Sequence, residues 1–294
     1  MAIYLKKYWN KKVLLFFTIL LPFIAQASFI LIPMDDLSQK NHLKAYGITF
    51  FSLQKGNNVK WLLNYRGGSF LLEDVEIFRN ECKIRGVSYE LISDTEALQI
   101  LEEIASPSQN MEAIILEKAP KIAVYSPKDN VPWDDAVTMV LNYAEIPYDV
   151  IYDEEVLQDK LLLYEWLHLH HEDFTGQFGK FYGVYRTAPW YIEAKRDAEN
   201  LALRLGYSKV SQEKLAVAIR IRDYVIGGGF MFAMCSATDS FDIALAAEGV
   251  DICEPMFDGD PSEANYQNKM DFSNTFAFTN FELVRNPTEY EFSN

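Results

Sequence analysis

The part of the sequence best suited to chemistry surrounds Cys235. An apolar run, Phe230–Met234, leads directly into this cysteine, and the pattern that follows predicts a helix over Asp239–Ala247. A strand, a nucleophilic side chain and a helix in this order present the nucleophile at the carboxyl end of a sheet. Backbone N–H groups at the amino end of the helix would stabilise a thiolate and an oxyanion. We therefore predict that Cys235 is a nucleophile and that N–H groups near Ser236 bind the oxyanion.

The residues that flank Cys235 leave a second interpretation open. The usual nucleophile turn reads Gly-x-nucleophile-x-Gly, whereas Met234 and Ser236-Ala237 flank Cys235 here. A small buried cysteine at the end of a strand would give the same pattern. Gly228 and Gly229, just before the strand, are candidate substrate-binding residues.

A second concentration of reactive side chains lies between residues 167 and 173. If this segment is helical, His168, His171 and Glu172 share one face at i, i+3 and i+4, a spacing that could hold Zn²⁺ or another divalent metal. His171 could instead serve as the base for Cys235. A polar helix end with solvated histidines is the simpler interpretation. No cofactor other than such a metal ion is indicated.

Two further charged residues could bind a substrate. Asp134 follows a predicted strand and could orient a substrate amine, although acids in a first helical turn more often cap the helix. Arg66 precedes a pair of glycines, and its guanidinium could bind a carboxylate. A simple turn after a strand would explain the same residues.

The composition limits the class of protein and of partner. The 294 residues are 49% hydrophobic, which is enough to build a packed core and excludes a disordered chain. Lys and Arg number 27 against 42 Asp and Glu, giving a formal charge of −15. This acidity argues against nucleic acid as a partner, because phosphate binding requires a basic surface. We expect a small amide or acyl substrate, or a protein partner.

The first residues have the three parts of a secretory signal peptide. Four lysines between positions 6 and 12 precede the apolar run Val13–Ala25, and Ala25-Gln26-Ala27 is a small-x-small site. We predict cleavage after Ala27 and a periplasmic or otherwise exported protein without stable membrane association. An uncleaved anchor over Val13–Ile32 is the alternative.

The number of cysteines bears on the same prediction. The chain has three cysteines, and an odd number outside the cytoplasm leaves at least one free thiol or an intermolecular bond. Cys82 and Cys253 could pair and leave Cys235 free.

Periodicity predicts two regions after the signal peptide. In 28–118 we predict a hairpin of the apolar run Ile48–Leu53 with Val59–Tyr65, then further helices and a strand. In 119–294 strands and helices alternate, which is typical of a parallel sheet with crossover helices. An aromatic-rich helical insertion is expected over Tyr164–Leu205. The other predicted elements are a helix over Glu73–Arg85 stopped by Gly86, a strand over Val87–Ile92, a helix over Asp94–Ala105, strands at Lys121–Tyr125 and Tyr148–Tyr152, and helices over Asp134–Ala144, Asp153–Leu163 and Ser211–Val225.

These strands and the Cys235 turn resemble the class I glutamine amidotransferase-like fold. More closely, the segments 62–70, 146–150, 170–177 and the Cys235 segment resemble exported Bacteroidetes proteins usually labelled "asparagine synthetase B". The resemblance covers most of the mature chain. It implies a doubly wound, flavodoxin-like α/β sheet, preceded by a smaller α/β segment, and a Cys-His-Glu triad.

The resemblance also sets expectations about activity. The chain lacks the amino-terminal cysteine and the Ser-Gly-Gly-x-Asp-Ser loop of ATP-dependent asparagine synthesis, so we do not expect that reaction. In amidotransferase-like enzymes the histidine follows the cysteine, whereas no histidine follows His171. We therefore expect that the domain continues beyond residue 294, or that the triad is absent. An exported Cys-dependent amide or acyl hydrolase or transferase is one expectation, and a non-catalytic binding module with a degenerate triad is the other.

Overall fold

The computed structural model describes residues 28–127 and 136–294, and these form two compact units. The first unit ends at Lys118 and the second begins at Ala119. The predicted signal peptide and Asp134 lie outside the described residues. Among the residues described, no helix combines the length and the apolar character needed to cross a membrane.

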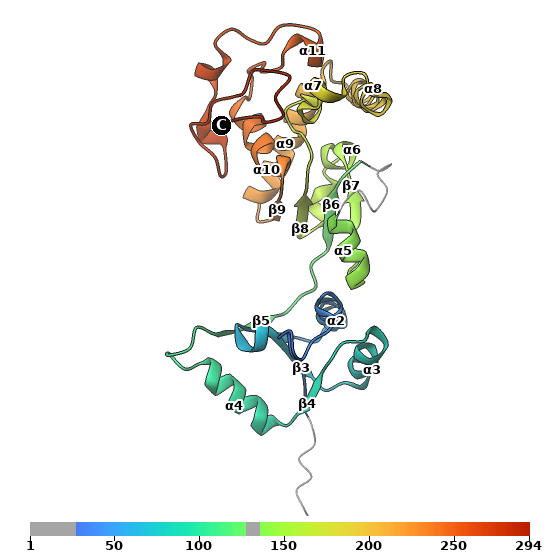
Figure 1. The fold of residues 1–294 in the computed structure, drawn as a ribbon, viewed down its shortest axis with the longest axis vertical. Helices are drawn as coiled ribbons and strands as arrows, with labels where there is room; N and C mark the ends of the chain where they lie inside the picture. The colour runs from blue at the N-terminus through green and yellow to red at the C-terminus, as the bar shows by residue number, and fades with distance from the viewer. Residues whose placement is uncertain (1–27, 128–135) are drawn as a thin grey trace, which may run out of the picture. The chain divides into compact units, whose positions relative to one another are not determined.

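The first unit is an antiparallel sheet with helices on both faces (Figure 1). Its strands are β1 (Phe29–Ile32), β2 (Val59–Leu63), β3 (Ser69–Glu73), β4 (Glu90–Ile92) and β5 (Glu112–Leu116), in the order β4-β1-β3-β2-β5. Its helices are α2 (His42–Gln54), α3 (Glu76–Arg85) and α4 (Asp94–Ile104). The first four strands with α2 and α3 follow the split β-α-β-β-α-β arrangement, and β5 extends the sheet beside β2.

Consecutive residues of β3 point to the two faces of this sheet. Phe70 meets Tyr46 of α2, with ring centroids 5.4 Å apart. Leu71 faces the other way and packs in a cluster with Ala97 and Ile104 of α4. The strand alternation therefore places α2 on one face and α4 on the other.

The predicted hairpin in this unit is wrong, because its first strand is a helix. Ile48–Leu53 lies within α2, which is capped by the Asn41 side chain accepting from the Lys44 N–H. Residues on several sides of α2 are buried, so its apolar run lacks a clear period and cannot be distinguished from a strand by pattern. The β2 strand is present, and it pairs with β3 instead.

Two predicted helix boundaries in this unit are confirmed, the end of α3 and the start of α4. The α3 helix ends as predicted at Gly86, whose φ of 68° is the left-handed conformation that glycine tolerates. The next helix begins at Asp94, but its N-cap is Ser93, which forms a reciprocal capping box with Glu96.

The second unit is an α/β fold with a parallel four-stranded sheet. Its strands are β6 (Ile122–Tyr125), β7 (Asp149–Ile151), β8 (Trp166–Leu169) and β9 (Phe230–Ala233), in the order β7-β6-β8-β9. Its α-helices are α5 (Ala136–Ala144), α6 (Asp153–Leu157), α7 (Tyr182–Tyr185), α8 (Pro189–Arg204), α9 (Val210–Ile226), α10 (Ser236–Ala246) and α11 (Pro255–Asp258). The predicted parallel sheet with crossover helices is confirmed.

The strand order of this sheet has a switch point between β6 and β8. From β6 the chain crosses to β7 on one side and then to β8 on the other side. The connections that leave the carboxyl ends of β6 and β8 therefore diverge. Open parallel sheets bind ligands at such a point. A ligand-binding site is therefore expected among the residues that follow β6, β8 and β9.

The core of the second unit lies between one sheet face and the helices α6, α9 and α10. Leu167 and Leu169 of β8 are fully buried there with Val217 and Ile221 of α9 and Phe241 of α10. Figure 1 shows α9 and α10 beside β8 and β9. This packing fixes the end of β9, and therefore Cys235, against the helical layer.

Two expectations about this sheet are wrong. The segment containing His168 is the interior strand β8, so the aromatic insertion begins only after Leu169 and contains α7 and α8. A continuous apolar run such as Phe230–Met234 predicts a strand covered on both faces, but β9 lies at the sheet edge and Phe230 and Phe232 remain 56% and 46% exposed. Short apolar runs do not reveal whether a strand is central or at the edge.

Candidate functional site

Cys235 lies in the turn that joins β9 to α10, and its side chain is exposed. Its backbone has φ 53° and ψ −141°, a combination that a side chain rarely adopts and that costs on the order of 1–3 kcal/mol. The helix begins at Ser236, three residues earlier than predicted. The predicted order of strand, cysteine and helix is thus present, with a sharper turn than expected.

Backbone hydrogen bonds close this turn around the cysteine. The Ala237 N–H donates to the Met234 carbonyl at 3.2 Å, and the Thr238 N–H donates to the Cys235 carbonyl at 3.1 Å. The Thr238 hydroxyl donates to the same Cys235 carbonyl at 2.6 Å. Ser236 is the first helical residue, so its N–H has no acceptor within the helix. That N–H is a suitable donor to an oxyanion that forms at Cys235.

The loop that follows β8 lies against the Cys235 turn. The Ser236 hydroxyl donates to the His171 carbonyl at 2.9 Å, which joins the two segments. The His171 side chain is exposed, and its Nδ1 lies 3.0 Å from Nδ1 of His170. The structure therefore brings the backbone of the predicted base beside the predicted nucleophile, across the carboxyl ends of β8 and β9.

A buried polar cluster that was not predicted lies at the carboxyl ends of β6 and β7. Lys214 of α9 is 5% exposed, and its ammonium donates to both Asp153 carboxylate oxygens at 2.9 and 2.8 Å. It also donates to the hydroxyls of Tyr125 and Tyr152 at 3.0 and 3.1 Å. The Tyr125 hydroxyl donates to Asp153 as well. One ammonium thus ties the ends of two strands to α9.

Glu172 connects this buried cluster to the loop that carries His171. Its carboxyl lies close enough to Lys214 and Asp153 for their charges to act on its pKa. Its backbone carbonyl accepts from the Ser240 hydroxyl of α10 at 3.0 Å. The main chain of Glu172 is therefore held against α10, and its carboxyl lies within electrostatic reach of Lys214 on α9.

Burial shifts the protonation equilibria of this region. It raises the pKa of Glu172 to about 7, although Lys214 acts in the opposite direction. Burial also raises the pKa of Glu213, which is 1% exposed, above its usual range. Burial alone would lower the pKa of Lys214, but Asp153 and the two phenols outweigh it, so the pKa is raised. The cluster thus holds an ammonium beside two carboxyls that are readily protonated near neutral pH.

The sequence contains one signal that could have revealed this cluster. Lys214 shares a helix face with the buried residues Val210, Val217 and Ile221, at the spacing of core positions. A lysine at such a position requires a buried acceptor. The sequence does not say which carboxylate supplies it, because Asp153 is 61 residues away along the chain.

The structure does not bring the two glycines that we predicted to bind substrate beside Cys235. Gly228 and Gly229 precede β9, whereas Cys235 follows it, so a strand about 13 Å long separates them. A Cβ at Gly229 would lie 2.2 Å from the Tyr224 ring, which explains the glycine by close packing.

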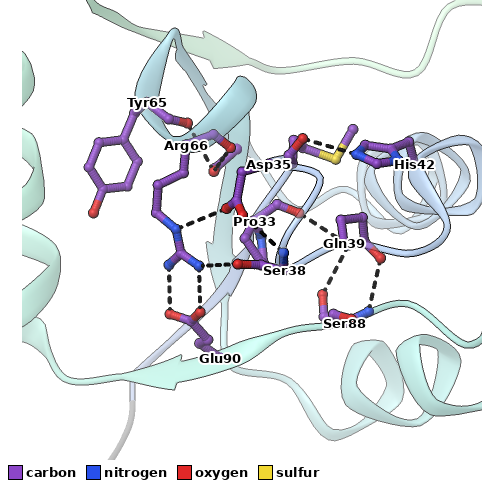
Figure 2. Close-up of polar contacts among 11 residues, drawn as sticks. Pro33, Asp35, Ser38, Gln39, His42, Tyr65, Arg66, Ser88 and Glu90 are labelled. Carbon is purple, nitrogen blue, oxygen red and sulfur yellow. Dashed lines mark hydrogen bonds and ion pairs between the residues drawn. The ribbon is translucent and has the colours of Figure 1, made fainter.

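The guanidinium of Arg66, which we predicted to bind a substrate carboxylate, binds carboxylates of its own unit in the structure. Its guanidinium donates to both oxygens of Glu90 at 2.9 and 2.8 Å, to Asp35 at 3.2 Å and to the Ser38 hydroxyl at 3.0 Å (Figure 2). These contacts all lie within the first unit. Arg66 therefore clamps the end of β1 to β4.

The proposed metal ligands are not assembled. His168 lies on β8 and is 3% exposed, with its ring stacked 5.7 Å from Phe232, so the helical spacing to His171 and Glu172 does not exist. Within residues 28–127 and 136–294, one other group has metal-ligand spacing, consisting of Asp251, Cys253 and Asp258.

Lys209 already lies among the carboxylates of that second group. Its ammonium is 2.6 Å from Asp251, 3.0 Å from Asp258 and 2.5 Å from Asp260. An ammonium in this position neutralises the carboxylates that would attract a metal ion.

The other two cysteines do not form the disulfide that was considered. Cys82 and Cys253 are both free and buried, and they belong to different units. Burial raises the pKa of Cys82 to about 12, and it also raises that of Cys253. Cys235 is thus the exposed thiol of the three.

A cavity of about 260 Å³ lies away from Cys235, near the far end of α10. Ala244, Ala247 and Ile252 supply apolar walls, and Lys209, Ser211 and Asp251 supply polar groups. Its volume is just below the usual range for small-molecule sites.

Comparisons with known proteins found no similarity to report: no protein-family model, no curated protein and no solved structure matches this chain.

Proposed function

We propose that this protein is a cysteine-dependent hydrolase or transferase acting on an amide or another acyl group, with Cys235 as its nucleophile. The observation that carries the proposal is the exposed Cys235 at φ 53° and ψ −141°, between a parallel strand and the amino end of a helix. Backbone strain of this kind persists where function requires a side chain to be presented in one direction.

The proposed reaction uses groups around the turn. His171 accepts the thiol proton, and the Cys235 sulfur forms a bond to the acyl carbon while the carbonyl electron pair moves to oxygen. The Ser236 N–H stabilises that oxyanion. The carbonyl re-forms as the amine leaves with the proton from His171. Water, or another acceptor, then cleaves the thioester and restores the thiol.

The same proposal includes the type of fold and the location. The strand order β7-β6-β8-β9 agrees with a flavodoxin-like sheet, in which the second strand lies outside the first and the third and fourth follow on its other side. The resemblance to amidotransferase-like proteins labelled "asparagine synthetase B" supports an acyl-transfer chemistry without ATP. Export rests on the amino-terminal sequence alone.

Alkylation of the purified full-length protein with iodoacetamide, followed by peptide mass spectrometry, tests the nucleophile. Cys82 and Cys253 are buried internal comparators in the same sample. We expect Cys235 to react at least about tenfold faster than a free thiol in a short peptide, since a helix amino terminus favours the thiolate. A panel of primary amides, with release of ammonia as the readout, then reports activity.

The control is Cys235→Ser, which keeps the turn and removes the thiol. We expect this variant to fold normally and to release no ammonia. Alkylation of Cys235 at the rate of the peptide thiol, together with no ammonia release from any amide, would reject the enzyme proposal.

A binding module is the second candidate, and the cavity near the end of α10 favours it. This cavity is separate from Cys235 and combines apolar walls with the polar groups of Lys209 and Asp251. A ligand that raises the melting temperature equally in the wild type and in Cys235→Ser would support this candidate.

A further inference from the structure

We propose that two copies of this chain associate through the outer edge of β9, with the two β9 strands antiparallel about a two-fold axis. Among the residues that the structure describes, β9 pairs with β8 alone and ends the parallel sheet (Figure 1). Nothing in this pairing requires Cys235 to react, so it goes beyond the function proposed above.

The backbone of β9 directs hydrogen-bonding groups towards this outer edge. The N–H groups of Phe230 and Met234 each donate at 3.0 Å to a carbonyl on the β8 side. Successive residues of a strand direct their backbone groups to opposite sides. The N–H and carbonyl groups of Met231 and Ala233 therefore point away from β8, where a further strand can pair with them.

The β9 edge lacks the features by which proteins prevent unwanted strand pairing. Lysine, proline, inward-pointing charges and bulges serve this purpose on exposed edge strands. The strand and its flanks have no lysine or proline, and no charged residue lies between Asp223 and Asp239. Phe230 and Phe232 are half exposed on the sheet face opposite the core. Outward-pointing backbone groups beside exposed apolar side chains favour the addition of a strand.

The distribution of charge favours a second copy of the chain at this edge. The chain carries a formal charge of −15, so two copies repel each other over most of their surfaces. The uncharged β9 strand is where they can approach with little repulsion. Pairing of β9 with β7 of another copy would instead bury the exposed Asp149 carboxylate of β7 beside apolar side chains. That arrangement would also repeat without closing, whereas a two-fold β9 pair closes.

The outward-pointing groups determine the register of the pair. A two-fold axis at Phe232 places Met231 of each copy opposite Ala233 of the other, which closes a hydrogen-bonded pair on each side of the axis. Phe232 then lies opposite its own copy in a non-hydrogen-bonded pair, with Cα atoms about 4.5 Å apart. Phe230 of each copy lies opposite Met234 of the other. The exposed apolar side chains of the two strands therefore cover one another.

Sedimentation equilibrium of the purified full-length protein over a range of concentrations tests the pairing. We expect a reversible equilibrium between monomer and dimer. Phe232→Lys places like charges opposite each other at the axis and should weaken association at least about tenfold, and Phe232→Glu should do the same. An equimolar mixture of the two variants places opposite charges at the axis. It should associate at least about tenfold more tightly than either variant alone.

Val150→Lys is the matched control, because Val150 is 40% exposed on the strand at the other edge of the same sheet. This variant should associate as the wild type does. Amide hydrogen exchange supplies a second readout, since exchange at Met231 and Ala233 should slow as the protein concentration rises. Slow exchange in β8 of each variant shows that the sheet remains folded.

Several results would overturn the two-fold β9 pair. A wild-type protein that stays monomeric at all concentrations would do so, as would assemblies larger than a dimer. Equal weakening by Val150→Lys, or no recovery in the mixture of the two Phe232 variants, would place the contact elsewhere. Exchange at Met231 and Ala233 that is slow at every concentration would show that another segment of the same chain occupies the edge.

Discussion

Arg66 in the first unit and Cys235 in the second both have a positive φ next to a sheet, but the contacts around them differ. Arg66, at φ 44° and ψ 52°, lies in the left-handed helical region, and Asp35 and Glu90 bind its guanidinium. Cys235, at ψ −141°, lies outside that region, and its exposed side chain does not cap the helix it precedes. Ion pairs offset the strain at Arg66, whereas the strain at Cys235 is one ground on which we propose a function for that residue.

The charged clusters of the two units differ in how far their side chains are exposed to solvent. The Arg66 side chain is 31% exposed and its partners Asp35 and Glu90 are 28% and 45% exposed. Lys214 and Asp153 are 6% and 1% exposed. Water screens the first set and leaves the second set strongly coupled. Loss of one charged partner should therefore cost more stability in the Lys214 cluster than in the Arg66 cluster.

The largest expected effect separates these two charged clusters. Lys214→Met would leave Asp153 buried without a counter-charge and should destabilise the second unit by about 3–5 kcal/mol. Arg66→Met is the matched control and should cost the first unit about 1 kcal/mol or less. Urea unfolding followed by a probe in each unit measures both values. Equal losses of unfolding free energy in the two variants would contradict the expectation that the buried cluster contributes more than the exposed one.

A smaller effect concerns the pH dependence of the buried cluster. The pKa of Glu172 is raised from 4.5 to about 7, so between these values the folded state binds more protons than the unfolded state. Stability should therefore fall as the pH rises through this window, by about 1–2 kcal/mol after allowance for the partial exposure of Glu172. Glu172→Gln should flatten that slope, and chemical unfolding at several pH values measures it.

Glu213 provides the check on this assignment. Its pKa is raised by the same burial, so part of the slope should persist in Glu172→Gln. Stability that rises with pH across the same window would contradict the direction of both shifts.

The smallest expected effect tests the strain at Cys235 directly. Cys235→Gly should stabilise the second unit by about 1 kcal/mol, because glycine adopts φ 53° and ψ −141° at little cost. Cys235→Ala retains the strained backbone and should leave the stability unchanged. Thermal unfolding of the two variants compares them, and destabilisation by the glycine would show that the turn is not strained.

Local signals in the sequence predicted much of the secondary structure. Gly86 ends α3 because glycine readily adopts the left-handed backbone conformation that follows the last helical turn. Residues 121–125 contain a strand because a short apolar run is typical of an interior strand of a parallel sheet. The order of strand, cysteine and helix at Cys235 was predicted on the same basis. These features depend on neighbours within a few residues.

Predictions that required knowledge of distant neighbours failed. A helix and a strand both explain the run Ile48–Leu53, and packing against the sheet and α3 selected the helix. The segment containing His168 had helical metal-ligand spacing, but pairing with β6 and β9 made it a strand. The residue type of Arg66 suits a substrate carboxylate, but the pairing of its guanidinium with Glu90, 24 residues away, could not be read from the sequence.

The sequence by itself determined the end of α3 at Gly86, the alternation that produces a parallel sheet, and the placement of a cysteine between a strand and a helix. Such features depend on backbone preferences and periodicity, which act over one or two turns. Only the tertiary structure decided that Lys214 binds Asp153 and that Ser236 reaches the His171 carbonyl. Those contacts join residues from different strands and helices, and the strand order that brings them together is set by burial of the whole core.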